Sequence, residues 1–154
     1  MHGIIVELHN RSFDSPEEYL TPEDVEAPTL DRLGLDYVDG TDRNEALEAF
    51  ASATAQVFEW NKSKTSFTVN SDTARKWFEA RLDTLKTNVA ALTLETFCDE
   101  LTAYGLSNLI EDECDVFIYY WDESSYWTLD TFMRKLKYID ATQFFVGGVL
   151  DYHM

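Results

Sequence analysis

Positive charge is scarce in this sequence of 154 residues, which has 12 Lys and Arg residues against 29 Asp and Glu residues and a formal net charge of −17. Nucleic acids are polyanions that bind proteins largely through lysine and arginine, so the composition argues against direct binding of DNA or RNA. Anionic membrane surfaces attract basic segments in the same way, so membrane binding is also disfavoured. The excess of acid predicts a basic partner or a surface adapted to a salty solvent.

Long hydrophobic runs are also missing. No stretch approaches the roughly 20 apolar residues that a transmembrane helix needs. The opening residues MHGIIVELHN have no basic region and only a short apolar run, unlike a signal peptide. We therefore expect a soluble cytoplasmic protein, encoded by a host, a phage or a plasmid.

Cysteine is rare in the chain. Cys98 and Cys114 are too few for a disulfide framework at this length. Cys98 falls on the apolar side of a predicted helix, where a buried free thiol is the common outcome.

Short motifs that carry catalytic chemistry are absent. The sequence contains no glycine-rich phosphate loop and no G-x-S-x-G, H-E-x-x-H or C-x-x-C pattern. The segment DECDVFIYYWDE has acids at both ends, but it lacks the central glycine of a calcium-binding EF-hand loop and is apolar in the middle.

Three histidines, His2, His9 and His153, lie in the predicted terminal strands. If those strands pair, His9, Asp151 and His153 are conceivable as a metal or acid–base cluster. His2 and His9 face opposite sides of a regular strand, however, and surface histidines are the simpler interpretation. We expect no metal, no cofactor and no catalytic residue. An enzyme with an unrecognised carboxylate site is a minor alternative.

Hydrophobic residues are plentiful, at 45% of the chain, and 14% of the residues are aromatic. This content is enough for a packed core, and the length fits a single domain over residues 1–154. Strands are predicted at 3–8, 65–70, 115–121 and 142–152, with Gly147-Gly148 as a bulge or a close backbone approach.

Helical patterns separate these strands. They cover residues 43–60, residues 72–90, residues 94–104 up to Gly105, and a short segment that Thr128 caps. We therefore expect an α+β domain with a small, mainly antiparallel sheet of about four strands packed with helices.

An acidic arm is predicted at about residues 10–42. It contains all three prolines, and Ser15 and Thr21 precede two of them as helix-capping residues. One or two short helical turns laid over the surface are expected. A binding arm and a solvated loop both fit this composition.

The acidic residues are concentrated in two blocks. Residues 1–60 hold 14 acids and 3 bases, and residues 93–130 hold 10 acids and no base. A surface adapted only for solubility tends to intersperse or spread its charges. The blocks therefore predict particular faces that are strongly negative.

Mimicry of a nucleic acid is the function that this charge favours most. A domain of this size spans roughly 35 Å, and duplex DNA carries about 20 charges over that length. Acids held rigidly at the ends of the strand at 115–121 would meet a partner's lysines and arginines, with nearby aromatics as anchors. The candidate contact residues are Asp99, Glu100, Glu111, Asp112, Glu113, Asp115, Asp122, Glu123, Tyr126 and Trp127, with Glu45 and Glu48 as a second patch.

We therefore expect an inhibitor that blocks a basic, nucleic-acid-binding protein. It would be an anti-CRISPR or anti-restriction protein of a phage or plasmid, or the immunity protein of a nuclease. The alternatives are an ordinary acidic domain of a halophile and a structural interaction module. The oligomeric state is open, and a dimer could form through an exposed terminal strand.

Overall fold

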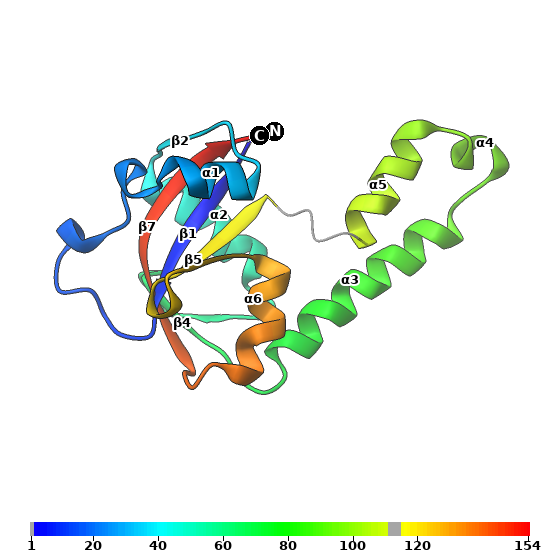
Figure 1. Cartoon of the computed structure of the whole chain (residues 1–154). Coiled ribbons are helices and arrows are strands. Elements are labelled where there is room, and N and C mark those ends of the chain that lie inside the picture. Colours follow the sequence, from blue (N-terminus) through cyan, green and yellow to red (C-terminus); the bar gives the residue numbers. More distant parts are fainter. Residues whose placement is uncertain (1, 111–114) are drawn as a thin grey trace.

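The computed structural model describes residues 2–110 and 115–154 as an α+β fold around one open, mixed sheet. The sheet has seven strands in the order β3-β4-β7-β1-β5-β6, and β2 also pairs with β7 (Figure 1). The strands are β1 (His2–His9), β2 (Tyr37–Gly40), β3 (Glu59–Trp60), β4 (Ser66–Thr68), β5 (Val116–Tyr120), β6 (Ser125–Thr128) and β7 (Gln143–His153).

Helices cover both faces of this sheet. The α-helices are α1 (Ala27–Leu33), α2 (Arg43–Thr54), α3 (Thr73–Ala90), α4 (Leu94–Phe97), α5 (Glu100–Ile110) and α6 (Leu129–Lys135). The 3-10 turns are η1 (Pro16–Glu18), η2 (Pro22–Asp24), η3 (Trp121–Glu123) and η4 (Leu136–Tyr138).

The α+β class is confirmed, but the prediction of a small, mainly antiparallel sheet of about four strands is wrong. All four predicted strands exist, as β1, β4, β5 and β7. The missed strands β2, β3 and β6 are only two to four residues long, too short for alternation to show. Strands β1 and β5 pair in parallel, which the sequence pattern does not reveal because they are far apart in the chain.

Gly147 and Gly148 form the predicted bulge in β7. Val6 pairs with Val149 and Leu8 with Val146, so β7 contains one more residue than β1 between these two pairs. Val146 and Val149 therefore both face the same core. Beyond the bulge, alternation resumes and Leu150 reaches the other face of the sheet.

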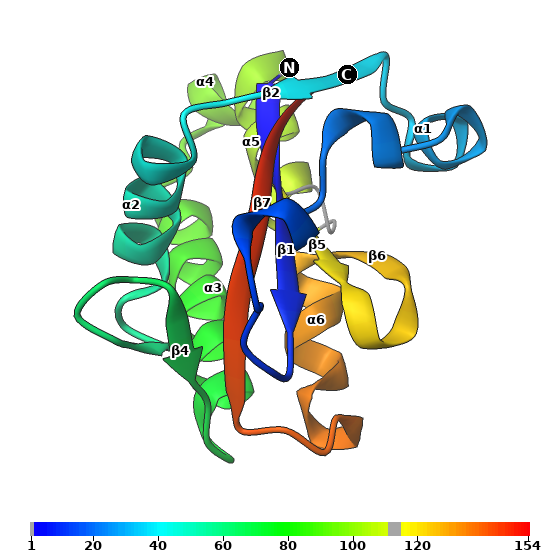
Figure 2. The ribbon, with the colours of Figure 1, turned by 90° about the vertical axis from the view of Figure 1, so that its left-hand side faces the viewer.

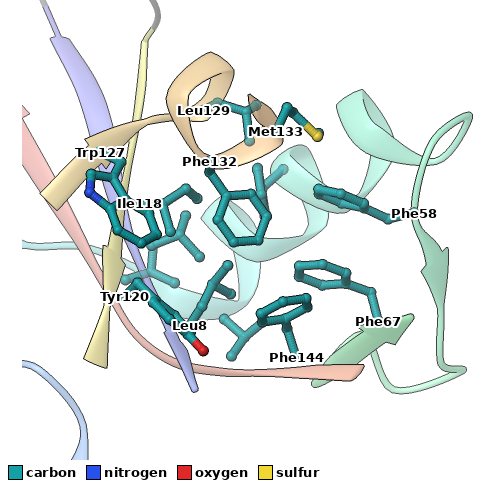
Figure 3. Close-up of a cluster of buried hydrophobic side chains, with 14 of the residues drawn as sticks. Leu8, Phe58, Phe67, Ile118, Tyr120, Trp127, Leu129, Phe132, Met133 and Phe144 are labelled. Carbon is teal, nitrogen blue, oxygen red and sulfur yellow. The ribbon is translucent and has the colours of Figure 1, made fainter. Parts of the chain in front are cut away.

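The larger core lies between the sheet and helices α2, α3 and α6. Figure 3 shows side chains of α6 meeting aromatic rings from the sheet. Phe58 stacks on Phe67 with ring centroids 4.1 Å apart, and Phe132 meets Phe144 edge-on at 5.3 Å. Thr128 caps α6, as predicted, by accepting a hydrogen bond from the Thr131 N–H.

A buried carboxylate joins α3 to α6. Asp130 is 2% exposed, and its Oδ1 accepts a 2.6 Å hydrogen bond from Trp77 Nε1. Arg81 forms an ion pair with the other carboxylate oxygen. Both partners come from α3, so this cluster fixes the first three turns of that helix against the core.

Residues 73–110 form a helical hairpin, which projects from the sheet beyond these turns (Figure 1). Helix α3 leads outward, α4 lies at the tip, and α5 returns beside α3. The predicted helix over 94–104 is in fact broken after Phe97, and Gly105 lies inside α5 instead of ending it. Cys98, predicted to be buried, is exposed.

Substituting Gly148 tests the bulge. A Cβ atom at this position would lie 2.3 Å from the Leu20 carbonyl oxygen, which is backbone and cannot rotate away. We expect Gly148→Ala to lower the free energy of unfolding by about 1–3 kcal/mol, measured by urea denaturation. Gly40→Ala is the matched control, because nothing lies within 4 Å of its Cβ position. Equal urea midpoints for the two variants would contradict the close approach.

Candidate acidic binding face

The acidic arm, residues 10–42, covers the face of the sheet opposite the larger core. Figure 2 views the molecule from this side, with the arm in front of β1 and β7. The expected helical turns are present. Ser15 caps η1 by accepting a hydrogen bond from the Glu17 N–H, and Thr21 and Asp24 form a capping box at η2.

The inner side of the arm is apolar. Leu20, Val25 and Leu35 are at most 8% exposed and pack with Ile5 and Leu150 of the sheet. Burying one side chain of this size stabilises the folded state by about 1.5–3 kcal/mol. The arm is therefore a packed layer of the fold and not a loose loop.

The outer side of the arm is acidic. The arm contains ten carboxylates and two bases, for a net charge of −8, and every one of the ten is solvent-exposed. We call this surface the acidic face. Its carboxylates are Asp14, Glu17, Glu18, Glu23, Asp24, Glu26, Asp31, Asp36, Asp39 and Asp42.

One buried carboxylate ties the arm to the sheet. Glu7, on β1, is 1% exposed. Its Oε2 accepts hydrogen bonds from the backbone N–H groups of Leu20, in the arm, and Gly148, in the bulge, both at 2.7 Å. A single oxygen atom thus holds two segments that are far apart in the sequence.

Burial sets the ionisation of this group. Loss of solvent raises the pKa of Glu7, and the two backbone N–H groups oppose the rise because they favour the charged form. The nearby Asp24 adds to the rise and Arg43 lowers the pKa. Glu7 is therefore the acid whose protonation is most directly coupled to the position of the arm.

Arg43 completes the attachment from the other side of the bulge. Its Nε donates to the Gly147 carbonyl at 2.7 Å, and its Nη2 donates to the Val146 carbonyl at 2.8 Å. Its guanidinium also lies over the ring of Tyr19, 4.8 Å from the centroid. The irregular backbone of the bulge is thus hydrogen-bonded on both sides, and the ring of an arm residue is held in place.

A cleft of about 290 Å³ opens where the arm leaves β1. Its walls include the aromatic ring of Trp121 and the carboxylates of Asp14 and Glu18. Trp121 is 44% exposed and stacks on the buried ring of His9 at 4.6 Å. The Arg11 guanidinium lies 5.9 Å from the Trp121 ring centroid, so this ring already faces one cation.

His9 and Asp122 lie behind this cleft, at the carboxyl ends of the parallel strands β1 and β5. The Oδ2 of Asp122 lies 3.4 Å from His9 Nδ1 and accepts the Asn10 N–H at 3.0 Å. Within the described residues, no hydrogen bond joins Ser12, in the same cleft, to His9. His9 Nδ1 instead accepts the Arg11 N–H at 3.3 Å, so His9 and Asp122 position the start of the arm.

The predicted contact acids that the structure describes lie on several different elements. Asp99 and Glu100 lie on the hairpin, Asp115 immediately precedes β5, and Asp122 and Glu123 lie in η3 at the other end of that strand. Glu45 and Glu48 are on α2, where Glu48 forms an ion pair with Lys64. Glu111, Asp112 and Glu113 lie outside the described residues. Asp122 contacts the arm by accepting a hydrogen bond from the Asn10 N–H.

The two predicted aromatic anchors lie on opposite faces of β6. Tyr126 is on the arm side and packs on Tyr119, with ring centroids 4.6 Å apart. Burial raises the pKa of Tyr126 to about 12, and Tyr119 and Asp24 add to the shift. Trp127 belongs to the larger core beside Tyr120 and is 9% exposed, so it is not available as a contact residue.

The histidines also group differently from the conceivable cluster. His9 lies at the opposite end of β1 from Asp151 and His153, and His2 takes its place. His2 lies 3.3 Å from Asp151, and His153 lies 3.0 Å from Asp36. Among residues 2–110 and 115–154, no group of His, Cys, Asp or Glu is placed to hold a metal ion.

Sequence reasoning predicted the acidic arm but left open whether it is a binding arm or a solvated loop, and it placed the candidate contact residues elsewhere. Residues 10–42 alternate acids and prolines with isolated apolar residues. What the sequence does not show is that those apolar residues dock on the sheet. Among the described residues, no helix has the length and apolar character needed to cross a membrane.

Comparisons with known proteins do not assign this site. No known protein family, curated protein or solved structure matches the chain. The function must therefore be argued from the acidic face and the cleft beside it.

Replacing Glu7 tests the attachment of the arm. Glu7→Ala leaves two buried N–H groups without an acceptor, at a cost of about 1–3 kcal/mol each. We expect it to lower the free energy of unfolding by about 2–5 kcal/mol and to make the arm sensitive to proteolysis. Glu7→Gln keeps an oxygen acceptor and should cost about 1 kcal/mol or less. If both variants unfold like the wild type, the carboxylate does not hold the arm.

The pH dependence of stability gives an independent test. Because the pKa of Glu7 is raised above its ordinary value of 4.5, the native state binds more protons than the unfolded state between those two pKa values. The Glu7 contribution to stability therefore increases as pH falls through this window. We expect Glu7→Gln to gain less stability than the wild type as pH falls from neutrality toward 4.5, in urea titrations at each pH. Glu45→Gln, an exposed control, should keep the wild-type slope.

Proposed function

We propose that the protein is an acidic inhibitor that binds the nucleic-acid-binding surface of a basic protein. The observation that carries the proposal is the two-sided construction of the arm. Its apolar residues pack on the sheet, while all ten of its carboxylates face solvent. A loop that served only for solubility would not need to be packed and attached in this way.

The amount of charge supports this proposal. Duplex DNA carries about 20 charges over the roughly 35 Å that a domain of this size spans. The arm has a net charge of −8, and Asp122 and Glu123 add two exposed carboxylates beside its first residues. The acidic face therefore offers about half the charge density of a duplex, enough to attract a surface built to bind phosphates.

The attachment of the arm also favours binding. Glu7 and Arg43 bind backbone groups on both sides of the bulge, and the apolar residues of the arm are buried. The carboxylates are thus placed before a partner arrives. Less conformational entropy is lost on association than for a disordered acidic tail.

The cleft beside the arm fits a single cationic side chain of the partner. Trp121 is 44% exposed and supplies the ring on which Arg11 now lies, and Asp14 and Glu18 supply negative charge at the rim. A lysine or arginine side chain gains from both interactions. Arg11 already lies over the same ring, and a partner's arginine would take its place.

Inhibitors of this kind act against CRISPR effectors and restriction enzymes, or neutralise nucleases as immunity proteins. We favour such a role over an even acidic coat, because the charge is unevenly placed. Residues 10–42 have a net charge of −8, whereas residues 131–154 have a net charge of +1. The partner is recognised by its basic surface, and the protein itself should not bind duplex DNA.

Charge reversal tests the acidic face directly. The test variant carries Glu17→Lys, Glu23→Lys and Asp31→Lys, one on each helical element of the arm and none with a structural hydrogen bond from its side chain. We expect its affinity for the partner, captured from a lysate at low salt, to fall about 100-fold or more, because attraction becomes repulsion. Wild-type binding should weaken steeply as salt is raised.

Two further triple variants distinguish the effect of where the charge lies from the effect of how much charge is changed. Glu45→Lys, Glu59→Lys and Asp140→Lys change exposed residues outside the arm by the same total charge, and should reduce affinity about tenfold or less. The triple reversal of Glu111, Asp112 and Glu113 tests the second acidic block. If the arm triple stays folded and binds like the wild type, the acidic face is not the contact surface. Tight binding of duplex DNA at moderate salt would also contradict the proposal.

A further inference from the structure

A pocket of about 850 Å³ opens where the start of α3 meets the end of α6 and the chain that leads into β7 (Figure 1). The cleft beside the arm, in comparison, has about 290 Å³. Pockets that bind small molecules usually have volumes of about 300 to 1,000 Å³. No residue of the arm is among the described residues that line this pocket, so it is a candidate site separate from the acidic face.

Much of the pocket wall is apolar. Six apolar residues line it, and each belongs to the larger core or packs against it: Val69, Ala74, Met133, Leu136, Ile139 and Ala141. The fold therefore holds this wall in place before a ligand arrives, which lowers the entropy that binding costs. An apolar wall of this kind favours a ligand with an apolar body.

Positive charge gathers at the same pocket. Arg134, Lys135 and Lys137 line it, and no Asp or Glu is among its described lining residues. The acids that neighbour the lining segments in the chain, Asp72 and Asp140, are not part of the wall. Because the whole chain has a net charge of −17, a small anion is repelled by most of the surface and attracted to this pocket.

Two of these cations have no acidic partner. Lys135 Nζ lies 4.6 Å from the centroid of the Trp127 ring, and Lys137 Nζ lies 4.8 Å from that of Tyr138. Within the described part of the chain, neither lysine forms an ion pair. An aromatic ring attracts a cation but does not neutralise it. Both charges therefore remain available to a ligand.

Helix stabilisation accounts for only part of this charge. Arg134 and Lys135 lie in the last turn of α6, where cations favour the helix dipole. Lys137 lies beyond that helix, in η4. The dipole also gives no reason for an apolar pocket beside the three cations. The combination of an apolar wall and unpaired lysines is what a ligand with a charged group on an apolar body requires.

We propose that this pocket binds a small aromatic phosphate monoester, with the phosphate at Arg134, Lys135 and Lys137 and the ring on the apolar wall. A phosphate monoester carries a charge of about −1.5 to −2 at neutral pH, which matches the two lysines without acidic partners. A monocarboxylate would leave one of them unmatched. An aromatic ring supplies a large apolar area in a rigid form. This inference does not depend on the proposed function.

Isothermal titration calorimetry of the full chain at low salt tests the proposal with four probes. 1-Naphthyl phosphate, 1-naphthoate and 1-naphthalenemethanol share a ring system and carry about two, one and no negative charges, and inorganic phosphate lacks the ring. We expect 1-naphthyl phosphate to bind at one site, about tenfold or more tighter than each of the other three. If it binds no tighter than inorganic phosphate or the neutral alcohol, the proposal is wrong.

Removing the two lysine charges tests the location of the site. Lys135→Gln with Lys137→Gln should weaken binding of 1-naphthyl phosphate about tenfold or more, because the phosphate loses both unpaired cations. Lys62→Gln with Lys86→Gln is the matched control, because it changes the net charge equally at exposed residues outside the pocket. It should stay within about threefold of the wild type. A folded pocket variant, checked by thermal melting, that binds like the wild type would overturn the proposal.

A second variant tests the apolar wall without changing charge. Thr142 is exposed and lines the pocket, and its contact with Val69 is made by its backbone carbonyl. Thr142→Trp should therefore fold normally and should weaken 1-naphthyl phosphate about fivefold or more, because the new side chain occupies space that the ring needs. Unchanged affinity in this variant would mean that the ring does not lie in the pocket, which contradicts the proposal.

Two natural phosphate monoesters distinguish the possible sources of the ligand. Adenosine monophosphate represents nucleotides, and free O-phosphotyrosine represents phosphorylated amino acids. Tighter binding of either one than of inorganic phosphate supports the proposal and identifies the source, whereas equal or weaker binding of both contradicts it. None of these titrations involves the basic partner of the acidic face, so either proposal can fail without the other.

Discussion

The carboxylate of Glu7 is the contact on which the arrangement of this molecule depends. It lies on a central strand of the sheet, and one of its oxygens holds both the arm and the bulge of β7. The bulge can come this close only because Gly147 and Gly148 have no side chains. The arm, the two glycines and the acid are therefore a single unit, in which none of the three has its present position without the others. Arg43 extends this unit to α2.

This unit separates two uses of negative charge. One carboxylate is buried and organises backbone, and ten others on the arm are kept in water. Repulsion among those ten opposes folding of the arm, and burial of Leu20, Val25 and Leu35 must exceed it. The acidic face is thus held in place by apolar contacts beneath it. That explains how such a highly charged surface can be rigid, which a binding surface for a basic protein benefits from.

Much of the fold, but less of the site, was predictable from the sequence. The long strands, the bulge at Gly147-Gly148 and the cap at Thr128 follow from local patterns, and the structure confirms them. The extra strands and the parallel pairing of β1 with β5 were missed, because they depend on contacts between distant segments. The predicted burial of Cys98 was wrong for a related reason. A helix that projects from the core shows the same periodicity as one that packs on it.

The candidate site was harder, because carboxylates are so common that sequence blocks do not define surfaces. The described acids of residues 93–130 are close in the chain but lie on the hairpin, just before β5, in η3 and on α6. The two predicted aromatic anchors are neighbours on β6, so their side chains point to opposite faces of the sheet. Trp127 faces the core and Tyr126 faces the arm side, and one residue of register separates these outcomes.

The place of β7 in the sheet has a consequence for synthesis on the ribosome. This strand pairs with β1, β2 and β4, yet it follows all of them in the chain. The earlier strands therefore leave the exit tunnel before the strand that joins them has been synthesised. During this time their apolar faces are exposed to water. During that interval the acids of residues 1–60 already give the nascent chain a net charge of −11. Repulsion between nascent chains then protects them from aggregation until residues 143–153 complete the sheet.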